Sequence, residues 1–261
     1  MELVIWIEAF ALKAFTEIIR GPKTEQGQMA LLDTPGLILL KSGSNLEKVL
    51  KAGHFAFTGE CGPPRGANVD HLKEKYEPLK GVVDAVNITD NQTAVVRMSS
   101  MAASVHLVMA GLEPNYQMVC RDRNRLTMMG DVLGAYSLGI RRMLCLSGDH
   151  QKFGDHPQSK NVYDVDSMPL IAMIKKMRDE GRFLNEDKID VPPKMFIGAA
   201  SNPFGDPFEF RVYRLENKIA AGADFIQTQC VYNMPKFREF MKMTVDMGLT
   251  ENAISWLVLL P

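Results

Sequence analysis

The stretch KMFIGAASNPFGDPFEFRVYRLENKIAAGADFIQTQCVYN, residues 194–233, decides the fold because it contains one complete strand–helix–strand unit. An apolar run at 194–202 leads through a polar loop into a helix-like segment, which ends at Gly222, and a second apolar run begins at 225. A residue without Cβ ends a helix in the left-handed conformation at the least steric cost. Two strands joined through a helix in this way form a parallel pair.

The same unit repeats along the chain, with a spacing of roughly 30 residues. Other apolar runs lie at 55–60, 82–90, 116–122, 143–149 and 254–261, and other helix-ending glycines at Gly81, Gly111, Gly139, Gly181 and Gly248. Together the pattern predicts seven strands alternating with six helices. We therefore expect an α/β protein whose parallel sheet is covered on both faces.

Length and composition narrow the class of protein. A chain of 261 residues is about the size of one α/β barrel. The formal net charge of -1 gives no reason to expect nucleic acid or a membrane as a partner. Four cysteines, far apart in the sequence, are typical of unbridged thiols in the cytoplasm. The acidic residues Glu2 and Glu8 and the lack of a basic start followed by a cleavage site argue against a secretory signal or membrane span.

Residues 1–43 do not fit the repeat and are predicted to be an N-terminal extension, whereas residues 44–261 form one domain. Within the extension, residues 2–20 can form an amphipathic helix. Ser44 and Glu47 have the spacing of a capping box, which predicts a helix that ends at Gly53 and closes the bottom of a barrel. The charged segment 182–193 is predicted to be a surface loop.

Glu60 is the first candidate for chemistry, because ligands bind at the carboxyl ends of parallel strands. It ends an apolar strand and precedes Gly62-Pro63-Pro64, whose fixed backbone holds the carboxylate at the rim. Apolar neighbours disfavour the charged form, which suits a general acid. The alternative is an ordinary exposed glutamate at the end of a strand.

Asp149 ends another strand, after Ser147-Gly148. His150, Asp155 and His156 follow it, which makes a metal site one hypothesis and a solvated loop the other. Their spacing matches no compact metal motif.

Gln227 and Gln229 alternate on one strand and so face the same side. Amides that donate and accept hydrogen bonds suit a heterocycle such as a pterin. The alternative is a core glutamine that pairs with the backbone.

Several motifs, in this order along the chain, resemble those of methylenetetrahydrofolate reductases. They are GECGPPRG (59–66), NITDNQ (87–92), QMVCRDRNR (117–125), LSGDH (146–150) and GAASNPFGDPFEFRVYRLENKIAAGADFIQTQ (198–229). The resemblance covers about residues 44–250 and is strongest to the short form of acetogenic and related anaerobic bacteria.

The resemblance implies a (β/α)8 TIM barrel that binds a non-covalent flavin, normally FAD rather than FMN, at its carboxyl-end rim. The family reduces 5,10-methylenetetrahydrofolate to 5-methyltetrahydrofolate in one-carbon metabolism and methionine biosynthesis. Electrons come from NADH or, in many short forms, from a partner electron-transfer subunit, so a homo- or hetero-oligomer is expected.

The resemblance also implies roles for single residues. Glu60 matches the general acid, Asp149 the carboxylate beside flavin and pterin, and Gln229 the amide that contacts folate. The remaining positions match FAD contacts: Thr89, Gln117, Ser147, Tyr163, Asp166, Ala199 and Lys218. Gln117 and Ser147 depart from the pattern, since many relatives have histidine and arginine there.

Two other functions stay open, a metal-dependent barrel lyase or hydrolase and a non-catalytic folate-binding subunit. The end of the chain also raises a structural question, because the family's barrel continues beyond the strand at 254–260. We expect a barrel that lacks its last β/α unit and leaves a gap between the first and seventh strands. Residues 37–40 could partly cover that gap, although a plain gap is preferred.

Overall fold

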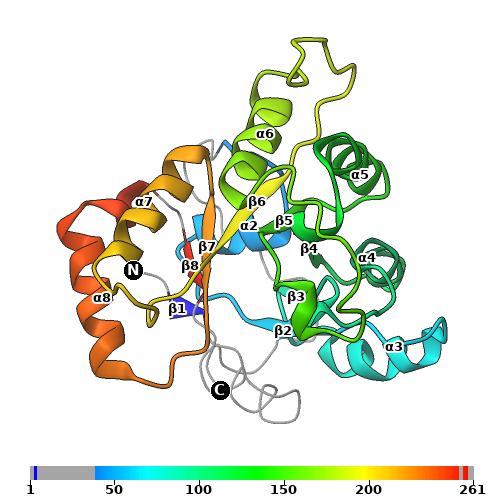
Figure 1. Cartoon of the computed structure of the whole chain (residues 1–261), viewed down its shortest axis with the longest axis horizontal. Coiled ribbons are helices and arrows are strands. Elements are labelled where there is room, and N and C mark those ends of the chain that lie inside the picture. Colours follow the sequence, from blue (N-terminus) through cyan, green and yellow to red (C-terminus); the bar gives the residue numbers. More distant parts are fainter. Residues whose placement is uncertain (1–2, 5–38, 253–254, 258–261) are drawn as a thin grey trace.

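The computed structural model describes residues 3–4, 39–252 and 255–257. In this part of the chain, eight parallel strands form one curled sheet in the order β1-β8-β7-β6-β5-β4-β3-β2. Figure 1 shows the helices α3 to α8 arranged around the outside of this sheet and α2 behind its middle. The fold is therefore the α/β architecture of a TIM barrel, present here as an open sheet.

The strands are short, as expected where buried runs alternate with helices. They are β1 (Leu3–Val4), β2 (Thr58–Glu60), β3 (Ala85–Ile88), β4 (Pro114–Val119), β5 (Arg142–Leu146), β6 (Phe196–Ser201), β7 (Phe225–Thr228) and β8 (Ser255–Leu257). The helices are α2 (Asn45–Lys51), α3 (Val69–Tyr76), α4 (Ser100–Met109), α5 (Arg125–Ser137), α6 (Ser167–Asp179), α7 (Phe210–Ala221), α8 (Met234–Asp246) and α9 (Leu249–Asn252). Short 3-10 turns lie at Glu77–Leu79, Gln92–Ala94, Cys120–Asp122 and Gln151–Phe153.

All seven predicted strands are confirmed, and the sheet is open as expected for an incomplete barrel, but a two-residue strand lies beside the seventh where a plain gap was preferred. The pairs Leu3↔Trp256 and Val4↔Leu257 place β1 on the outer edge of β8. Residues 3–4 are thus a strand and not part of a helix, while the rest of the predicted helix, residues 2 and 5–20, lies outside the described residues. Leu39 and Leu40 belong to no strand, and 37–38 lie outside the described residues. Among the described residues no pairing joins β1 to β2, so this sheet stays open.

The predicted helix-ending glycines are confirmed, since all six have positive φ angles, and Gly222 reaches 118° where it caps α7. Gly198, which lies inside β6 and ends no helix, is needed for side-chain packing. A Cβ at Gly198 would lie 2.2 Å from the Cζ of Phe225. Its absence lets the Phe225 ring stack on Phe196, with 5.2 Å between the centroids.

Alternation along the strands separates an outer core, under the helices, from a smaller inner one. Leu46, Val49 and Leu50 of α2 pack with the inner residues Phe196 and Phe225. The prediction that this helix closes the bottom of the barrel is therefore confirmed.

The capping box is only half correct. The Ser44 hydroxyl accepts a hydrogen bond from the Glu47 N–H at 3.2 Å. The Glu47 carboxylate instead accepts from the N–H groups of Lys41, Ser42 and Gly43, because the incoming chain folds over it.

Residues 182–193 form the predicted loop, with a single antiparallel bridge between Arg182 and Lys188. In the described part of the chain, no helix combines the length and apolar character needed to cross a membrane.

Candidate functional site

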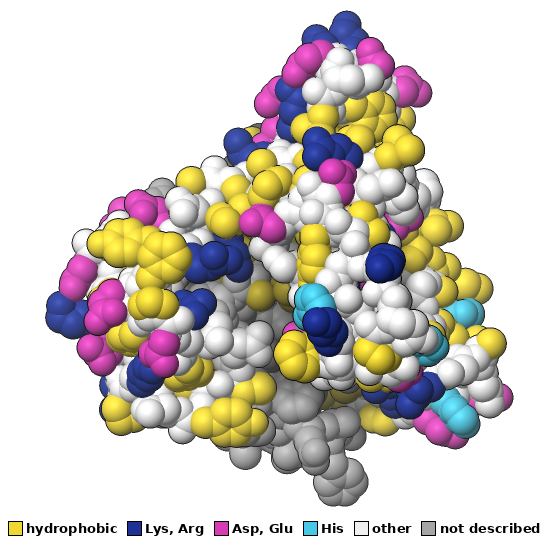
Figure 2. Space-filling view, in the orientation of Figure 1, with side chains coloured by type: hydrophobic (Ala, Val, Ile, Leu, Met, Phe, Trp, Pro, Cys, Tyr) yellow, Lys and Arg dark blue, Asp and Glu magenta, His cyan; other side chains and the backbone are white. Residues whose placement is uncertain are grey.

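A cavity of about 560 Å³ opens at the carboxyl ends of the strands. Seven of the side chains that the sequence singles out line it: Glu60, Thr89, Gln117, Ser147, Asp149, Gln227 and Gln229. On the face shown in Figure 2, a hollow lies between the α7–α8 side and the opposite half of the molecule, with basic side chains along its α7 edge. The strand ends thus bring residues from distant parts of the sequence into one site.

Glu60, at the end of β2, is half-buried, and no hydrogen bond joins its carboxylate to another described residue. Burial raises the pKa of the Glu60 carboxyl, and the positive charge of Lys75 partly opposes this effect. The Lys75 ammonium is held close by, donating a hydrogen bond to the Gly62 carbonyl at 2.8 Å. A carboxyl that keeps its proton to a higher pH than usual suits a proton donor.

Asp149 is fixed from two directions. Its Oδ2 accepts a hydrogen bond from the Thr93 N–H at 3.1 Å, and its carbonyl accepts one from Arg121 Nη1 at 3.0 Å. Arg121 is only 3% exposed and also donates to the Asn91 carbonyl at 3.3 Å. One guanidinium thus joins the loop after β3 to the loop after β5.

The loop after β3 has an unusual backbone. Asn91, Thr93 and Ala94 have φ angles of 44°, 56° and 57°, in the left-handed region that residues with a Cβ seldom adopt. Such strain is retained where the surrounding contacts impose it, which is common at functional sites. Arg121, which the sequence reasoning did not single out, supplies one of these contacts.

Asp90 is a second residue that the sequence reasoning missed. It lines the cavity, and its buried carboxylate accepts hydrogen bonds from Arg123 at 2.6 Å and from the Val119 N–H at 3.0 Å. This ion pair between Asp90 of NITDNQ and Arg123 of CRDRNR thus holds the ends of β3 and β4 together.

Three buried polar atoms that belong to residues lining the cavity have no hydrogen-bond partner among the described residues. They are Thr89 Oγ1, Gln227 Oε1 and Thr228 Oγ1. Buried polar atoms are nearly always paired in folded proteins, so such a group is a feature that a bound ligand would explain.

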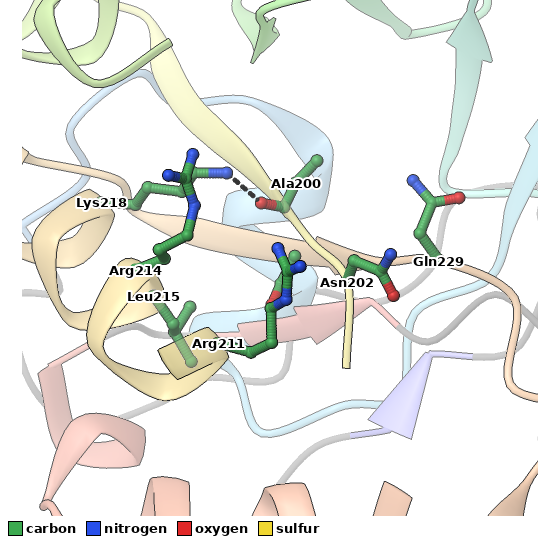
Figure 3. Close-up of a pocket in the computed structure, with 8 residues that line it drawn as sticks. Ala200, Asn202, Arg211, Arg214, Leu215, Lys218 and Gln229 are labelled. Atoms are coloured by element: carbon green, nitrogen blue, oxygen red, sulfur yellow. Dashed lines mark hydrogen bonds between the residues drawn. The ribbon is translucent and has the colours of Figure 1, made fainter. Parts of the chain in front are cut away.

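A second pocket, of about 180 Å³, adjoins the first and shares Ala200 and Gln229 with it. Figure 3 shows Arg211, Arg214 and Lys218 of α7 on one side of this pocket. The spacing of these residues, i, i+3 and i+7, places them on one helix face, and that spacing is the signal by which the two arginines could have been found.

Lys218 lies in this second pocket and donates a hydrogen bond to the Ala200 carbonyl at 2.6 Å (Figure 3). Burial lowers the pKa of the Lys218 ammonium to about 8, and the neighbouring charge of Arg214 acts in the same direction. A buried ammonium that binds its proton weakly gains from a nearby anion.

The remaining predicted residues lie outside the linings of both pockets. The Tyr163 hydroxyl donates to the Gly148 carbonyl at 3.2 Å, and Asp166 caps α6 by accepting from the Met168 N–H at 2.8 Å. The Ala199 side chain packs in the outer core. The neighbouring Ala200 lines both pockets. The Ala199 side chain therefore faces away from the cavity, which leaves only the Ala199 backbone to face a ligand there.

The residues of the metal hypothesis are engaged elsewhere. Asp155 pairs with Arg65 at 2.7 Å and with His156 Nδ1 at 2.9 Å, while His150 Nδ1 accepts from the Lys152 N–H at 3.3 Å. Within the described residues, no three His, Cys, Asp or Glu side chains come close enough to hold a metal ion.

Comparison with known proteins identifies the family of this chain. The sequence model of methylenetetrahydrofolate reductase matches residues 45–260. A Caenorhabditis elegans protein named "Probable methylenetetrahydrofolate reductase (NADPH)" is 26% identical over an alignment of 223 residues that covers 80% of this chain and 31% of that protein. The chain thus spans about a third of the length of this relative.

Two solved structures overlap more loosely. A Clostridium thermocellum protein, described as binding two copies of 5-methyl-5,6,7,8-tetrahydrofolic acid, is 13% identical, with a TM-score of 0.49 over 77% of this chain and 64% of its own. A putative lyase/mutase from Burkholderia cenocepacia is 11% identical, with a TM-score of 0.33 over 95% of this chain and 81% of its own. Neither overlap is close enough to bear on the site. The family match, in contrast, spans most of the sequence, and the chain belongs to the methylenetetrahydrofolate reductase family.

Proposed function

We propose that this protein reduces 5,10-methylenetetrahydrofolate to 5-methyltetrahydrofolate with a bound flavin. The observation that carries the proposal is the cavity at the carboxyl-end rim. It combines Glu60, whose pKa is raised by burial, with Asp149, whose position is fixed by hydrogen bonds. A proton donor and an oriented carboxylate facing one cavity are what this reduction needs from the protein.

The residues present fit a flavin. The larger cavity has unpartnered buried polar atoms at Thr89, Gln227 and Thr228, which suit the polar edge of a planar ring system. The adjoining pocket, with Arg214 and Lys218, suits phosphate groups. Two adjoining compartments of this kind suit a flavin with a phosphorylated tail, and the family resemblance favours FAD. When bound, the flavin supplies the hydride, and the protein orients the reactants.

Glu60 then acts on the substrate. We assign it the proton transfer to the folate nitrogen that is released when the methylene bridge opens, since opening yields an electrophilic iminium. Asp149 and Gln229 orient the pterin, because the carboxylate accepts hydrogen bonds and the amide both donates and accepts them. Thr89, Gln117, Ser147 and Lys218 are proposed to contact FAD, with Tyr163, Asp166 and the backbone at Ala199 more remote.

The source of electrons is a separate proposal. The C. elegans relative has NADPH in its name, but the chain spans only 31% of that protein. We propose NADH or a partner electron-transfer subunit, and an oligomer in either case. A cytoplasmic role in one-carbon metabolism and methionine biosynthesis agrees with the four free cysteines, three of which are buried.

The visible spectrum of the purified chain, after incubation with FAD and removal of the excess, tests the proposal. Flavin bands that stay with the protein are expected. A colourless protein with stoichiometric zinc would favour the metal-dependent lyase or hydrolase. A colourless, metal-free protein that binds tetrahydrofolate would favour the non-catalytic subunit.

A further inference from the structure

Gln227 lies below the rim of the cavity, inside a strand rather than in the loop that follows it. It is on the inner face of β7, two positions before Gln229 and two after Phe225, whose ring stacks on Phe196 to form an apolar floor. Gln227 is 6% exposed and lines the cavity. Its amide therefore lies between an aromatic floor and the pterin-facing residues of the rim.

The Gln227 amide has an unmet hydrogen bond. Its Oε1 has no hydrogen-bond partner among the described residues. The hypothesis of a core amide that pairs with the backbone therefore fails for this oxygen. Thr228 Oγ1 on the same strand and Thr89 Oγ1, just after β3, are also buried and unpartnered, and both residues line this cavity. A buried polar atom without a partner destabilises a protein, whereas a ligand that pairs with it recovers that cost on binding.

The chemistry of an amide restricts the ligand. Gln227 presents one acceptor and one donor group, and this remains true if the oxygen and nitrogen exchange places. The matching partner is a lactam edge, in which an N–H and a C=O are adjacent on a planar ring. A phosphate lacks the donor and an aliphatic chain lacks both groups, whereas flavins and pterins share this edge.

We propose that Gln227 is a ligand-binding residue that pairs with the lactam edge of a planar heterocycle inserted edge-first toward the Phe196–Phe225 floor. The inference rests on the proposed function, since flavin and folate are the two sources of that edge. It adds a residue to the site that the family resemblance does not assign.

The test compares Gln227→Met, which keeps the length of the side chain but removes both hydrogen-bonding groups, with Gln151→Met. Gln151 is a matched control, because its Oε1 is also buried without a partner but the residue does not line the cavity. Flavin fluorescence gives the Kd for FAD, and titration of the FAD-loaded protein gives the Kd for 5-methyltetrahydrofolate. Urea unfolding checks that each variant folds. If Gln227→Met does not fold, Gln227→Asn takes its place, because its shorter side chain withdraws the amide by one methylene.

We expect Gln227→Met to weaken one of the two ligands roughly tenfold, as for a lost hydrogen bond, and to leave the other unchanged. The affected ligand identifies the source of the lactam edge, and Gln151→Met should change neither Kd. If wild type binds ligand and both folded Gln227 variants bind both ligands within twofold of it, this inference alone is overturned. If wild type binds neither FAD nor folate, the proposed function is overturned together with it.

Discussion

The two sides of the cavity differ in how completely their polar groups are paired. On one side, which we call the β3–β5 wall, Asp90, Arg121 and Asp149 are all held by hydrogen bonds within the protein. On the other, the α7–β7 wall, Gln227 and Thr228 have unpartnered buried atoms and Arg214 forms no hydrogen bond with a described residue. There is an exception on each side: Thr89 is an unpartnered group beside the paired wall, and Lys218 on the α7–β7 wall donates to the Ala200 carbonyl.

The difference separates orientation from binding. Groups that are paired before a ligand arrives keep their geometry at no further cost, so they suit the positioning of reacting atoms. Groups without partners gain them only in the complex, so they contribute to affinity. Substitutions on the β3–β5 wall and at Glu60 beside it should therefore change rates, and those on the α7–β7 wall should change affinities.

The largest effect is expected for Glu60→Gln, because an amide cannot supply the proton for opening the methylene bridge. Reduction of methylenetetrahydrofolate should slow by about 10²- to 10⁴-fold in single-turnover kinetics. The Kd for FAD should stay at the wild-type value. A variant that reduces the substrate at near wild-type speed would remove Glu60 from the chemistry.

A smaller loss of rate is expected for Arg121→Met, which releases the Asp149 carbonyl and the Asn91 carbonyl together. Misplacing a positioned group by about 1 Å can cost about 10²-fold in rate, and we expect a loss of about 10- to 100-fold. Hydrogen exchange at residues 91–95 should accelerate, which reports the freed loop independently of activity. In an Asp149→Asn background the same substitution should cost less, because Arg121 acts by positioning the Asp149 carboxylate, which that background already lacks. Full additivity would show that Arg121 does not act through Asp149.

On the α7–β7 wall, Arg214→Met should weaken FAD binding by roughly tenfold or more, since a charge-assisted contact to phosphate is lost. The single-turnover rate at saturating FAD should not change. Arg238→Met on α8 is the matched control, because Arg238 is exposed and outside the pocket lining. Equal loss in both variants would indicate a general charge effect.

The pH dependence of FAD binding should be the mildest effect. Burial lowers the pKa of Lys218 to about 8, so the free protein loses this positive charge as the pH rises past that value. The affinity for FAD should be constant below about pH 7 and fall above about pH 8, by at most tenfold per pH unit. Lys218→Arg stays charged and should abolish the fall. A wild-type affinity that is flat to pH 9 would place Lys218 away from the phosphates.

The sequence predicted the strands well because each buried run and its helix-ending glycine form a local pattern. The strand at residues 3–4 was not predicted, because two residues are too few to show a periodicity. This strand also depends on pairing with a strand more than two hundred positions away in the sequence. The face of the strand on which each alanine lies was not predicted either: the Ala199 side chain packs in the outer core, and Ala200 lines the cavity. Glu60 and Asp149 were predicted because strand ends converge on one edge, whereas Arg121 depends on two loops whose contacts no spacing reveals.

The most direct test of the central claim is an anaerobic single turnover of the FAD-loaded chain. The bound flavin is reduced, excess reductant is removed, and 5,10-methylenetetrahydrofolate is added while the visible absorbance is followed. The account predicts that the bands of oxidised flavin return and that 5-methyltetrahydrofolate appears in an amount equal to the flavin reoxidised. A flavin that stays reduced, with the folate bound but unchanged, would contradict it.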